Sequence, residues 1–175
     1  MTVPSAGLSR RLVNWARAKS PWITIYNSGA CNACDIEIIA CLMPRFDIER
    51  FGILVEGSPR HADIMIVTGN VTLKQASRLR RVWEQMPEPK YVIAVGACGA
   101  SGGVFKGLYH VMGGVDGVIP VDAYVAGCPP RPDEIISAVV TCLNLLKEDA
   151  AHGGKEWRQK KPLPRMDAKG SPVIP

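Results

Sequence analysis

Apolar and polar residues alternate along the chain in blocks whose lengths and spacing predict strands and helices by turns. Four short blocks are almost continuously apolar, as buried strands are, at residues 22–27, 62–69, 91–98 and within 118–128. Three longer blocks place apolar residues three or four positions apart, as helices do, at residues 35–43, 72–86 and 132–148. The chain therefore reads as strands separated by helices.

Buried strands that alternate with helices are typical of a parallel sheet covered on both faces. We therefore predict an α/β domain of the flavodoxin-like kind, with an open parallel sheet of about four strands and helices on both faces. In such sheets, ligands bind beyond the carboxyl ends of the strands. Side chains that follow the predicted strands are consequently the first candidates for a functional site.

Charge divides the chain into three parts. Residues 1–21 hold four basic groups and no acid, and the apolar spacing over residues 8–18 predicts a short amphipathic helix. Residues 151–175 hold six basic and two acidic groups among prolines and glycines, and we expect an extended tail there. Because the whole chain carries +5, the domain at 22–150 is mildly acidic. Basic ends on an acidic core favour arms that bind an acidic partner over a nucleic-acid-binding face.

Composition sets limits on the class of protein. Apolar residues make up 47% of the chain and charged residues 21%, as in soluble globular proteins. The longest uncharged stretches are too short for a membrane span, and the start of the chain shows no signal-peptide pattern. We therefore expect a reducing compartment, where the six cysteines serve metal binding more readily than disulfide formation.

Four of the cysteines follow predicted strands. Cys31 and Cys34 come after the first strand, Cys98 ends the third, and Cys128 ends the fourth, in the pattern C-x2-C-x63-C-x29-C. We therefore expect these four at one edge of the sheet, in loops. The other two cysteines lie in apolar helical runs, so we expect them in the core; they are Cys41 and Cys142.

Four convergent thiolates indicate either zinc or an iron–sulfur cluster. Structural zinc usually takes two close pairs of cysteines, and only one close pair is present here. The spacing therefore favours a cluster, with a structural zinc scaffold of four cysteine ligands left open. A redox dithiol of the thioredoxin type would leave Cys98 and Cys128 without a role. A flavin carrier also remains open, although the cysteines occupy the edge where a flavin would lie. The glycines at 96–102 match neither a dinucleotide fingerprint nor a P-loop.

Several long motifs resemble one known family. SGACNACDIEI, PRHADIMIVTG, VIAVGACGASGGVF and GVDGVIPVDAYVAGCPPRPDEI are similar to segments of the small, cluster-bearing subunit shared by [NiFe] hydrogenases and respiratory complex I, where it is the 20 kDa subunit. The resemblance spans roughly residues 22–148. It implies one [4Fe–4S] cluster, the one nearest the catalytic subunit, and its implied ligands are Cys31, Cys34, Cys98 and Cys128.

The resemblance also assigns roles to other residues. Glu37 matches an acid of the family that could serve proton transfer or cluster tuning, and an ordinary acid near a helix start is an equal alternative. Arg60 and His61 match positions at which relatives contact the large subunit or its reaction cavity. No residue of this chain is implied to be catalytic by itself.

The first cysteine motif bears on the branch of the family. The quinone-reducing complex I subunits typically carry adjacent cysteines there, whereas this chain has C-x-x-C, and its tail has no cysteine for further clusters. The chain thus resembles the short small subunit of membrane-bound, energy-converting hydrogenases or of the related sulfane sulfur reductase. A quinone-reducing complex I subunit is the alternative.

Partners and location follow from the same resemblance. It implies a large catalytic subunit of the hydrogenase or 49 kDa type, a ferredoxin-like iron–sulfur subunit and membrane-arm subunits, in an ion-pumping complex that evolves hydrogen or reduces sulfane sulfur. The implied place is the cytoplasmic face of the cell membrane, as a peripheral subunit. We expect the N-terminal helix to face the membrane arm and the basic tail to lie along a neighbouring subunit.

Overall fold

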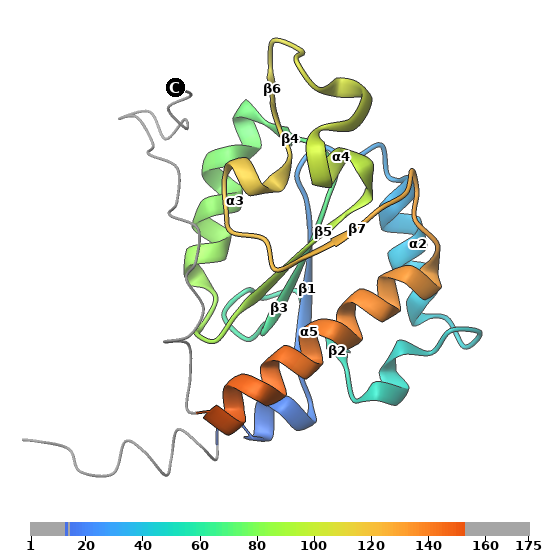
Figure 1. Cartoon of the computed structure of the whole chain (residues 1–175), viewed down its shortest axis with the longest axis vertical. Coiled ribbons are helices and arrows are strands. Elements are labelled where there is room, and N and C mark those ends of the chain that lie inside the picture. The colour runs from blue at the N-terminus through green and yellow to red at the C-terminus, as the bar shows by residue number, and fades with distance from the viewer. Residues whose placement is uncertain (1–12, 14, 153–175) are drawn as a thin grey trace, which may run out of the picture.

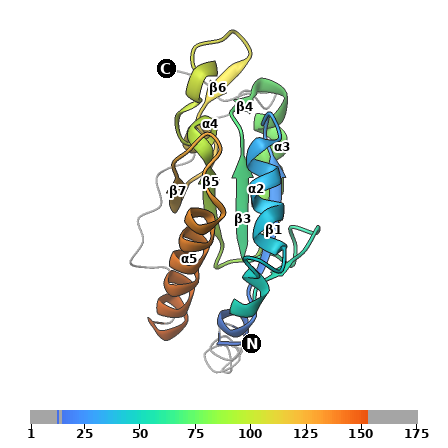
Figure 2. The same ribbon diagram turned by 90° about the vertical axis from the view of Figure 1, so that its right-hand side faces the viewer.

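A five-stranded parallel sheet forms the centre of the protein (Figures 1 and 2). The computed structural model describes residue 13 and residues 15–152 of the chain. The strand order in the sheet is β2-β1-β3-β5-β7, and every neighbouring pair is parallel. The strands are β1 (Trp22–Asn27), β2 (Leu54–Val55), β3 (Ile64–Thr68), β5 (Tyr91–Val95) and β7 (Ala123–Val125).

Helices cover both faces of this sheet. Helices α2 and α5 pack on one face and α3 on the other (Figure 1). A small antiparallel pair, β4 with β6, lies outside the main sheet. The α-helices are α2 (Ala33–Leu42), α3 (Leu73–Gln85), α4 (Gly96–Ser101) and α5 (Pro132–His152). The remaining elements are β4 (Val71–Thr72), β6 (Val111–Gly113) and the 3₁₀ turns η1 (Ile48–Phe51), η2 (Gly103–Phe105) and η3 (Val115–Gly117).

The alternation of side chains along β3 explains how one sheet serves two cores. Ile64 and Ile66 point toward the cluster under α2 and α5, whereas Met65 and Val67 join the cluster under α3. All four are at most 1% exposed. Because successive residues of a strand face opposite sides, a continuously apolar strand must be covered twice. The predicted α/β architecture with helices on both faces is confirmed.

The strand order indicates which edge of the sheet is expected to bind a ligand. Numbered in chain order within the sheet, the strands run 2-1-3-4-5, which is the flavodoxin-like arrangement. The chain leaves β1 for β2 on one side and then returns to β3 on the other side. Ligand sites of this fold lie where the strand order reverses, beyond the carboxyl ends of β1 and β3.

One predicted strand boundary was wrong, and one short strand was not predicted. The sheet has four strands with apolar runs, in agreement with the expected number, and a fifth strand, β2, which is only two residues long and exposed and so leaves no apolar run in the sequence. The third strand ends at Val95 and not at residue 98, because Gly96 adopts a φ of +85° and turns the chain into α4. The fourth predicted strand does lie within residues 118–128, as β7, and η3 with a turn and bends precedes it.

The ends of the chain are described only in part. Residues 15–19 are helical, which agrees with the end of the predicted N-terminal helix, whereas residues 8–12 and 14 lie outside the described residues. Most of the predicted tail at 151–175 also lies outside them. Among the described residues, no helix combines the length and apolar character that crossing a membrane requires.

Candidate functional site

The four cysteines that follow strands lie at the carboxyl end of the sheet. Cys31 lies in the loop after β1, and Cys34 lies in the first turn of α2. Cys98 is the third residue of α4, and Cys128 lies in the loop after β7. The predicted edge therefore agrees with the structure. The prediction that all four lie in loops was wrong, since Cys34 and Cys98 lie in the first turns of helices.

The thiols are close enough to influence one another's ionisation. Burial, followed by the neighbouring Cys31, Asp35, Cys128 and Cys98, raises the pKa of Cys34 to about 11. Burial likewise raises the pKa of Cys98, helped by Cys128 and Cys31. Each of the four thus takes part in one electrostatic group, although they come from three separate segments of the chain.

The four cysteines are not arranged as the ligands of a single metal ion. Among residues 15–152, no three Cys, His, Asp or Glu side chains approach closely enough to hold one metal ion. Exposure is graded across the group, with Cys31 and Cys128 exposed, Cys98 intermediate and Cys34 buried. The four sulfurs therefore line an open edge that a larger group could reach from outside.

Side-chain hydrogen bonds fix the first cysteine pair. The Asn27 side-chain oxygen accepts hydrogen bonds from the backbone N–H groups of Gly29 and Ala30, at 3.0 and 2.9 Å. The Asn27 amide also donates to Asp35 Oδ2 at 2.6 Å, and the Thr68 hydroxyl donates to Asp35 Oδ1 at 2.6 Å. The loop that carries Cys31 is thereby tied to the ends of both β1 and β3.

Glycines lie beside the sulfurs of Cys34 and Cys98. At Gly96 the φ is +85°, and a Cβ there would lie 2.7 Å from Cys34 Sγ. At Gly103 a Cβ would lie 3.1 Å from Cys98 Sγ. The N–H of Ala97 donates to the carbonyl of Gly127 at 2.7 Å, which joins the Cys98 helix to the Cys128 loop. Small residues thus leave the space beside the sulfurs free, as an inorganic cluster with backbone amides nearby requires.

The two remaining cysteines are structural. Cys41 is 1% exposed and Cys142 is fully buried, both in the core under α2 and α5. The Cys41 thiol donates to the carbonyl of Glu37 at 3.3 Å. Burial, together with the nearby Glu37 and Asp133, raises the pKa of Cys41 to about 11. The prediction that both belong to the core is confirmed.

The other predicted site residues do not all join the cysteines. Glu37 is half-buried on α2, one turn after Cys34. Arg60 and His61 are exposed and precede β3, so they lie at the amino end of the sheet, a strand length from the cysteines. There they line a pocket of about 340 Å³ with Trp22 and Arg17. The structure thus separates this pair from the candidate site.

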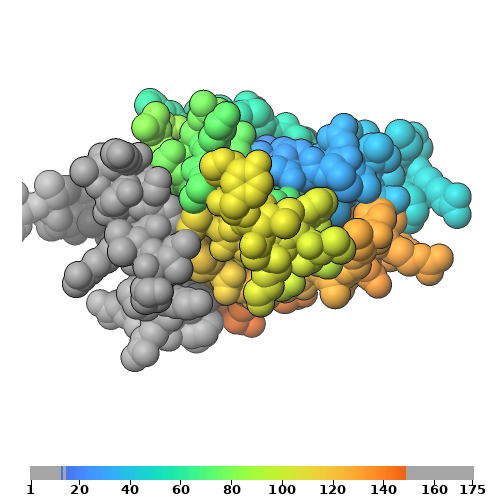
Figure 3. Space-filling model, turned by 90° about the horizontal axis from the view of Figure 1, so that it is seen from above, coloured from blue at the N-terminus to red at the C-terminus, as the bar shows by residue number. Residues whose placement is uncertain are grey.

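Apolar surface flanks the cysteine edge. Figure 3 looks onto this end, where α4 and the residues after it lie beside α2 and the loop before α5. An exposed apolar stripe begins on α2 and continues just past its end; it consists of Ile36, Ile39 and Met43. A second exposed group follows Cys98 in the chain, and it consists of Val104, Phe105, Leu108 and Tyr109. Clusters of exposed apolar side chains usually mark binding surfaces.

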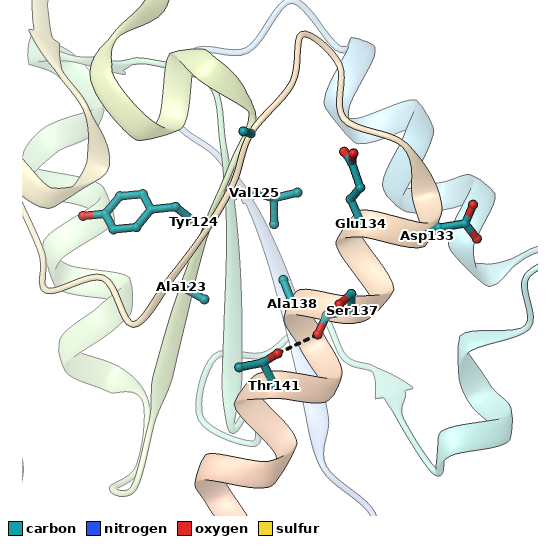
Figure 4. Close-up of a pocket in the computed structure, with 9 residues that line it drawn as sticks. Ala123, Tyr124, Val125, Asp133, Glu134, Ser137, Ala138 and Thr141 are labelled. Atoms are coloured by element: carbon teal, nitrogen blue, oxygen red, sulfur yellow. Dashed lines mark hydrogen bonds between the residues drawn. The ribbon is translucent and has the colours of Figure 1, made fainter.

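A groove runs between β7 and α5, beside the loop of Cys128 (Figure 4). Its volume is about 590 Å³. Val125 and Ala138 form its apolar floor, and Asp133 and Glu134 lie toward its upper end in the first turn of α5. β7 is the last strand of the described sheet, so this groove lies along a sheet edge.

Sequence reasoning missed the residues that fix the cysteine loop. Asn27, Asp35 and Thr68 had no assigned role, although Asn27-Ser28-Gly29 directly after a strand is a common signal for a side-chain-stabilised turn. Thr68 gave no such signal, because only the pairing of β1 with β3 brings its hydroxyl next to Asp35.

Comparisons with known proteins agree with this arrangement. The family described as NADH ubiquinone oxidoreductase, 20 kDa subunit, matches residues 31–142, which include all four cysteines of the candidate site. A probable membrane-bound hydrogenase subunit of Pyrococcus furiosus is 54% identical over 128 residues, covering 73% of this chain and 77% of the relative. An NADH-quinone oxidoreductase subunit of Bacteroides thetaiotaomicron is 44% identical over 157 residues, covering 89% of this chain and 78% of the relative.

A solved structure is similar as well. A chain in the structure of the membrane-bound sulfane sulfur reductase, an archaeal respiratory membrane complex, is 39% identical with a TM-score of 0.68. The match covers 79% of this chain and 76% of that one. These relatives are subunits of oxidoreductase complexes, and the family bears iron–sulfur clusters. The chain belongs to the 20 kDa subunit family that hydrogenases and complex I share.

Proposed function

We propose that this chain is the electron-transfer subunit that carries the proximal [4Fe–4S] cluster of a membrane-bound, ion-pumping respiratory complex. In this role it relays electrons from ferredoxin-fed clusters of a neighbouring subunit to the active site of the large subunit, where hydrogen is evolved or sulfane sulfur is reduced. The observation that carries the proposal is the convergence of Cys31, Cys34, Cys98 and Cys128 at one open edge of the sheet.

The residues present fit the proposed cofactor. An iron–sulfur cluster supplies, when bound, a group that takes up and releases one electron at a time. The four cysteines would hold it from separate positions, and the glycines at 96 and 103 leave room beside two of the sulfurs. Burial of Cys34 against the core would limit solvent on one side, while exposed Cys31 and Cys128 face outward.

The surfaces around the cysteines suit partner subunits. The apolar stripe that begins on α2 follows Cys34 in the chain, and the apolar group at 104–109 follows Cys98, so a subunit docked on these residues would come close to the cluster. We assign this position to the large catalytic subunit. The ferredoxin-like subunit and the membrane-arm subunits would bind other surfaces of this chain. The chain itself would be a peripheral subunit at the cytoplasmic face of the membrane. Glu37, half-buried near Cys34, remains a candidate for proton transfer or cluster tuning.

A second candidate is a quinone-reducing complex of the complex I type. The observation in its favour is the match to the Bacteroides NADH-quinone oxidoreductase subunit, which extends over 89% of this chain. The C-x-x-C spacing of Cys31 and Cys34 supports the hydrogenase or sulfane reductase branch instead. The two candidates share the same cysteine site and differ in what the large subunit does.

The test uses the native complex that contains this chain. We would record electron paramagnetic resonance after reduction and measure iron, zinc and nickel, in the wild type and in Cys98→Ser. We expect a cubane signal that the substitution abolishes or alters. The matched control is Cys142→Ser, a buried core cysteine, which should leave the signal unchanged.

The metal analysis separates the candidates. Nickel together with the signal would support the hydrogenase branch, and the signal without nickel would support the sulfane sulfur or quinone branch. Zinc in place of iron would overturn the electron-transfer role and support a structural scaffold. Flavin absorbance that survives Cys98→Ser would support a flavin carrier instead.

A further inference from the structure

The carboxylate of Asp35 links the start of α2 to two strands of the sheet. It follows Cys34 directly in the first turn of α2 and is only half-buried. Both of its oxygens accept short hydrogen bonds, from the Asn27 amide and from the Thr68 hydroxyl, each at 2.6 Å. One side chain thus joins the first turn of the cysteine helix to the ends of two strands.

The two hydrogen-bond donors of Asp35 also make contacts of their own around the loop that carries Cys31. Asn27, which bonds one oxygen, also holds the N–H groups of Gly29 and Ala30 in that loop. Thr68, which bonds the other, is fully buried at the end of β3, where its carbonyl accepts from Ser28. The Asp35 carboxylate is therefore connected through Asn27 to the backbone that directly precedes Cys31.

The charge of this carboxylate matters separately from its bonds. Both donors are neutral groups, so the hydrogen bonds fix the carboxylate in place and leave its negative charge uncompensated by them. The charge belongs to the residue directly after Cys34, in the same first turn of α2, so it lies beside one of the proposed ligands. A group held by the four cysteines would lie beside a fixed negative charge. Adding an electron next to such a charge is unfavourable.

We propose that Asp35 is a positioning and tuning residue of the cofactor site: its hydrogen bonds to Asn27 and Thr68 fix the Cys31–Cys34 loop, and its charge lowers the reduction potential of the iron–sulfur group bound there. The inference rests on the proposed function. The positioning and the tuning contributions of Asp35 can be tested separately. One variant can remove the charge, and another can remove a hydrogen bond while the charge stays.

The experiment compares the full chain, reconstituted anaerobically with iron and sulfide, as wild type, Asp35→Asn and Thr68→Val. Midpoint potentials come from titrations followed by electron paramagnetic resonance, and cluster retention comes from the rate of iron loss to a chelator. Glu49→Gln, which removes one exposed acid at the amino end of the sheet, is the matched charge control. Circular dichroism checks that each variant is folded.

The two variants should change different quantities, one the midpoint potential and the other the rate of iron loss. Asp35→Asn should raise the potential, with a roughly tenfold change in the ratio of reduced to oxidised cluster, which is about 59 mV for one electron. Thr68→Val keeps the charge, so it should release iron faster without raising the potential. Glu49→Gln should change neither quantity.

The outcomes separate the inference from the function on which it rests. A wild-type chain that binds zinc, or that binds no iron at all, would overturn the proposed function itself. A wild-type cluster whose potential is the same in Asp35→Asn would overturn the tuning role. Equal rates of iron loss in Thr68→Val and wild type would overturn the positioning role.

Discussion

Asp35 and Asp63 fasten opposite ends of the neighbouring strands β1 and β3 by different means. Asp35, at the carboxyl end, is half-buried and takes two neutral side-chain donors. Asp63, at the amino end, has a side chain only 3% exposed. It accepts the backbone N–H of Trp22 at 3.1 Å and lies 3.1 Å from Arg17 Nε.

The difference shows how one fold separates stability from function. At the amino end, a buried acid with a cationic neighbour joins the strands. At the carboxyl end, neutral hydrogen bonds and glycines hold the backbone while the sulfurs remain accessible. We therefore expect changes at the amino end to alter folding alone, and changes at the carboxyl end to alter cofactor binding as well.

The largest effect should follow from Gly96→Ala, at the carboxyl end. The residue has a φ of +85°, and the added Cβ would lie 2.7 Å from Cys34 Sγ. A strained backbone and an overpacked contact together should lower the free energy of unfolding by about 3 kcal/mol. Urea unfolding measures this loss, and iron analysis should show reduced cluster binding.

Gly57→Ala is the control for that substitution. Gly57 has no atom within 4 Å of an added Cβ, and its loop lies at the amino end. The free energy of unfolding should change by less than about 0.5 kcal/mol. Equal losses in the two variants would contradict the assignment of strain to the cysteine edge.

The next largest effect should follow from Asp63→Ala, at the amino end. The change leaves the Trp22 N–H without its side-chain acceptor and Arg17 without its neighbouring charge. Loss of a buried acceptor should lower the free energy of unfolding by about 2 kcal/mol. The ratio of iron to protein in the folded variant should match that of the wild type. A drop in this ratio would show that the two ends are not independent.

The sequence predicted the fold where many residues contribute to one pattern. β3 and β5 are apolar at nearly every position, and the 3.6-residue spacing of α3 is clear, so the alternation of strands and helices was readable. β2 could not be predicted, because two exposed residues carry no periodicity and only pairing with Trp22 and Ile23 makes them a strand.

The candidate site was predictable for a different reason. Cysteines are rare and chemically distinct, so their positions after predicted strands pointed to one edge of the sheet. The residues that hold this edge were not predictable, because Asp35 and Thr68 are ordinary polar residues 33 positions apart. Their roles depend on strand order, which the apolar pattern does not encode. Arg60 and His61 likewise needed the structure, which places them at the opposite end.

A smaller effect should follow from Cys142→Ala, in the core between the two ends. Cys142 is fully buried among residues of α2, α5 and the sheet. Removing the sulfur leaves a small cavity, which should lower the free energy of unfolding by about 1 kcal/mol. Iron content should not change. A loss of iron here would mean that a core cysteine reaches the cofactor, which the separation of the two groups of cysteines argues against.

The smallest expected effect concerns the pH dependence of the free energy of unfolding, and it is specific to Asp63 at the amino end. Burial raises the pKa of the Asp63 carboxyl above its ordinary 3.8, against the opposing influences of the Trp22 amide and Arg17. As pH rises from about 3.8, the folded chain therefore keeps a proton that the unfolded chain has released, so this group makes folding less favourable until the folded carboxyl ionises too. Asp63→Asn removes the contribution.

The measurement is urea unfolding of the wild type and Asp63→Asn across this pH range. The free energy of unfolding of the wild type minus that of the variant should fall as pH rises. The other acids contribute equally to both proteins, so their contributions cancel in this difference. Arg17→Gln should make the fall larger, because the nearby cation opposes it. A difference that rises with pH would mean that Arg17 outweighs burial, so that Asp63 and Arg17 form a stabilising ion pair at the amino end.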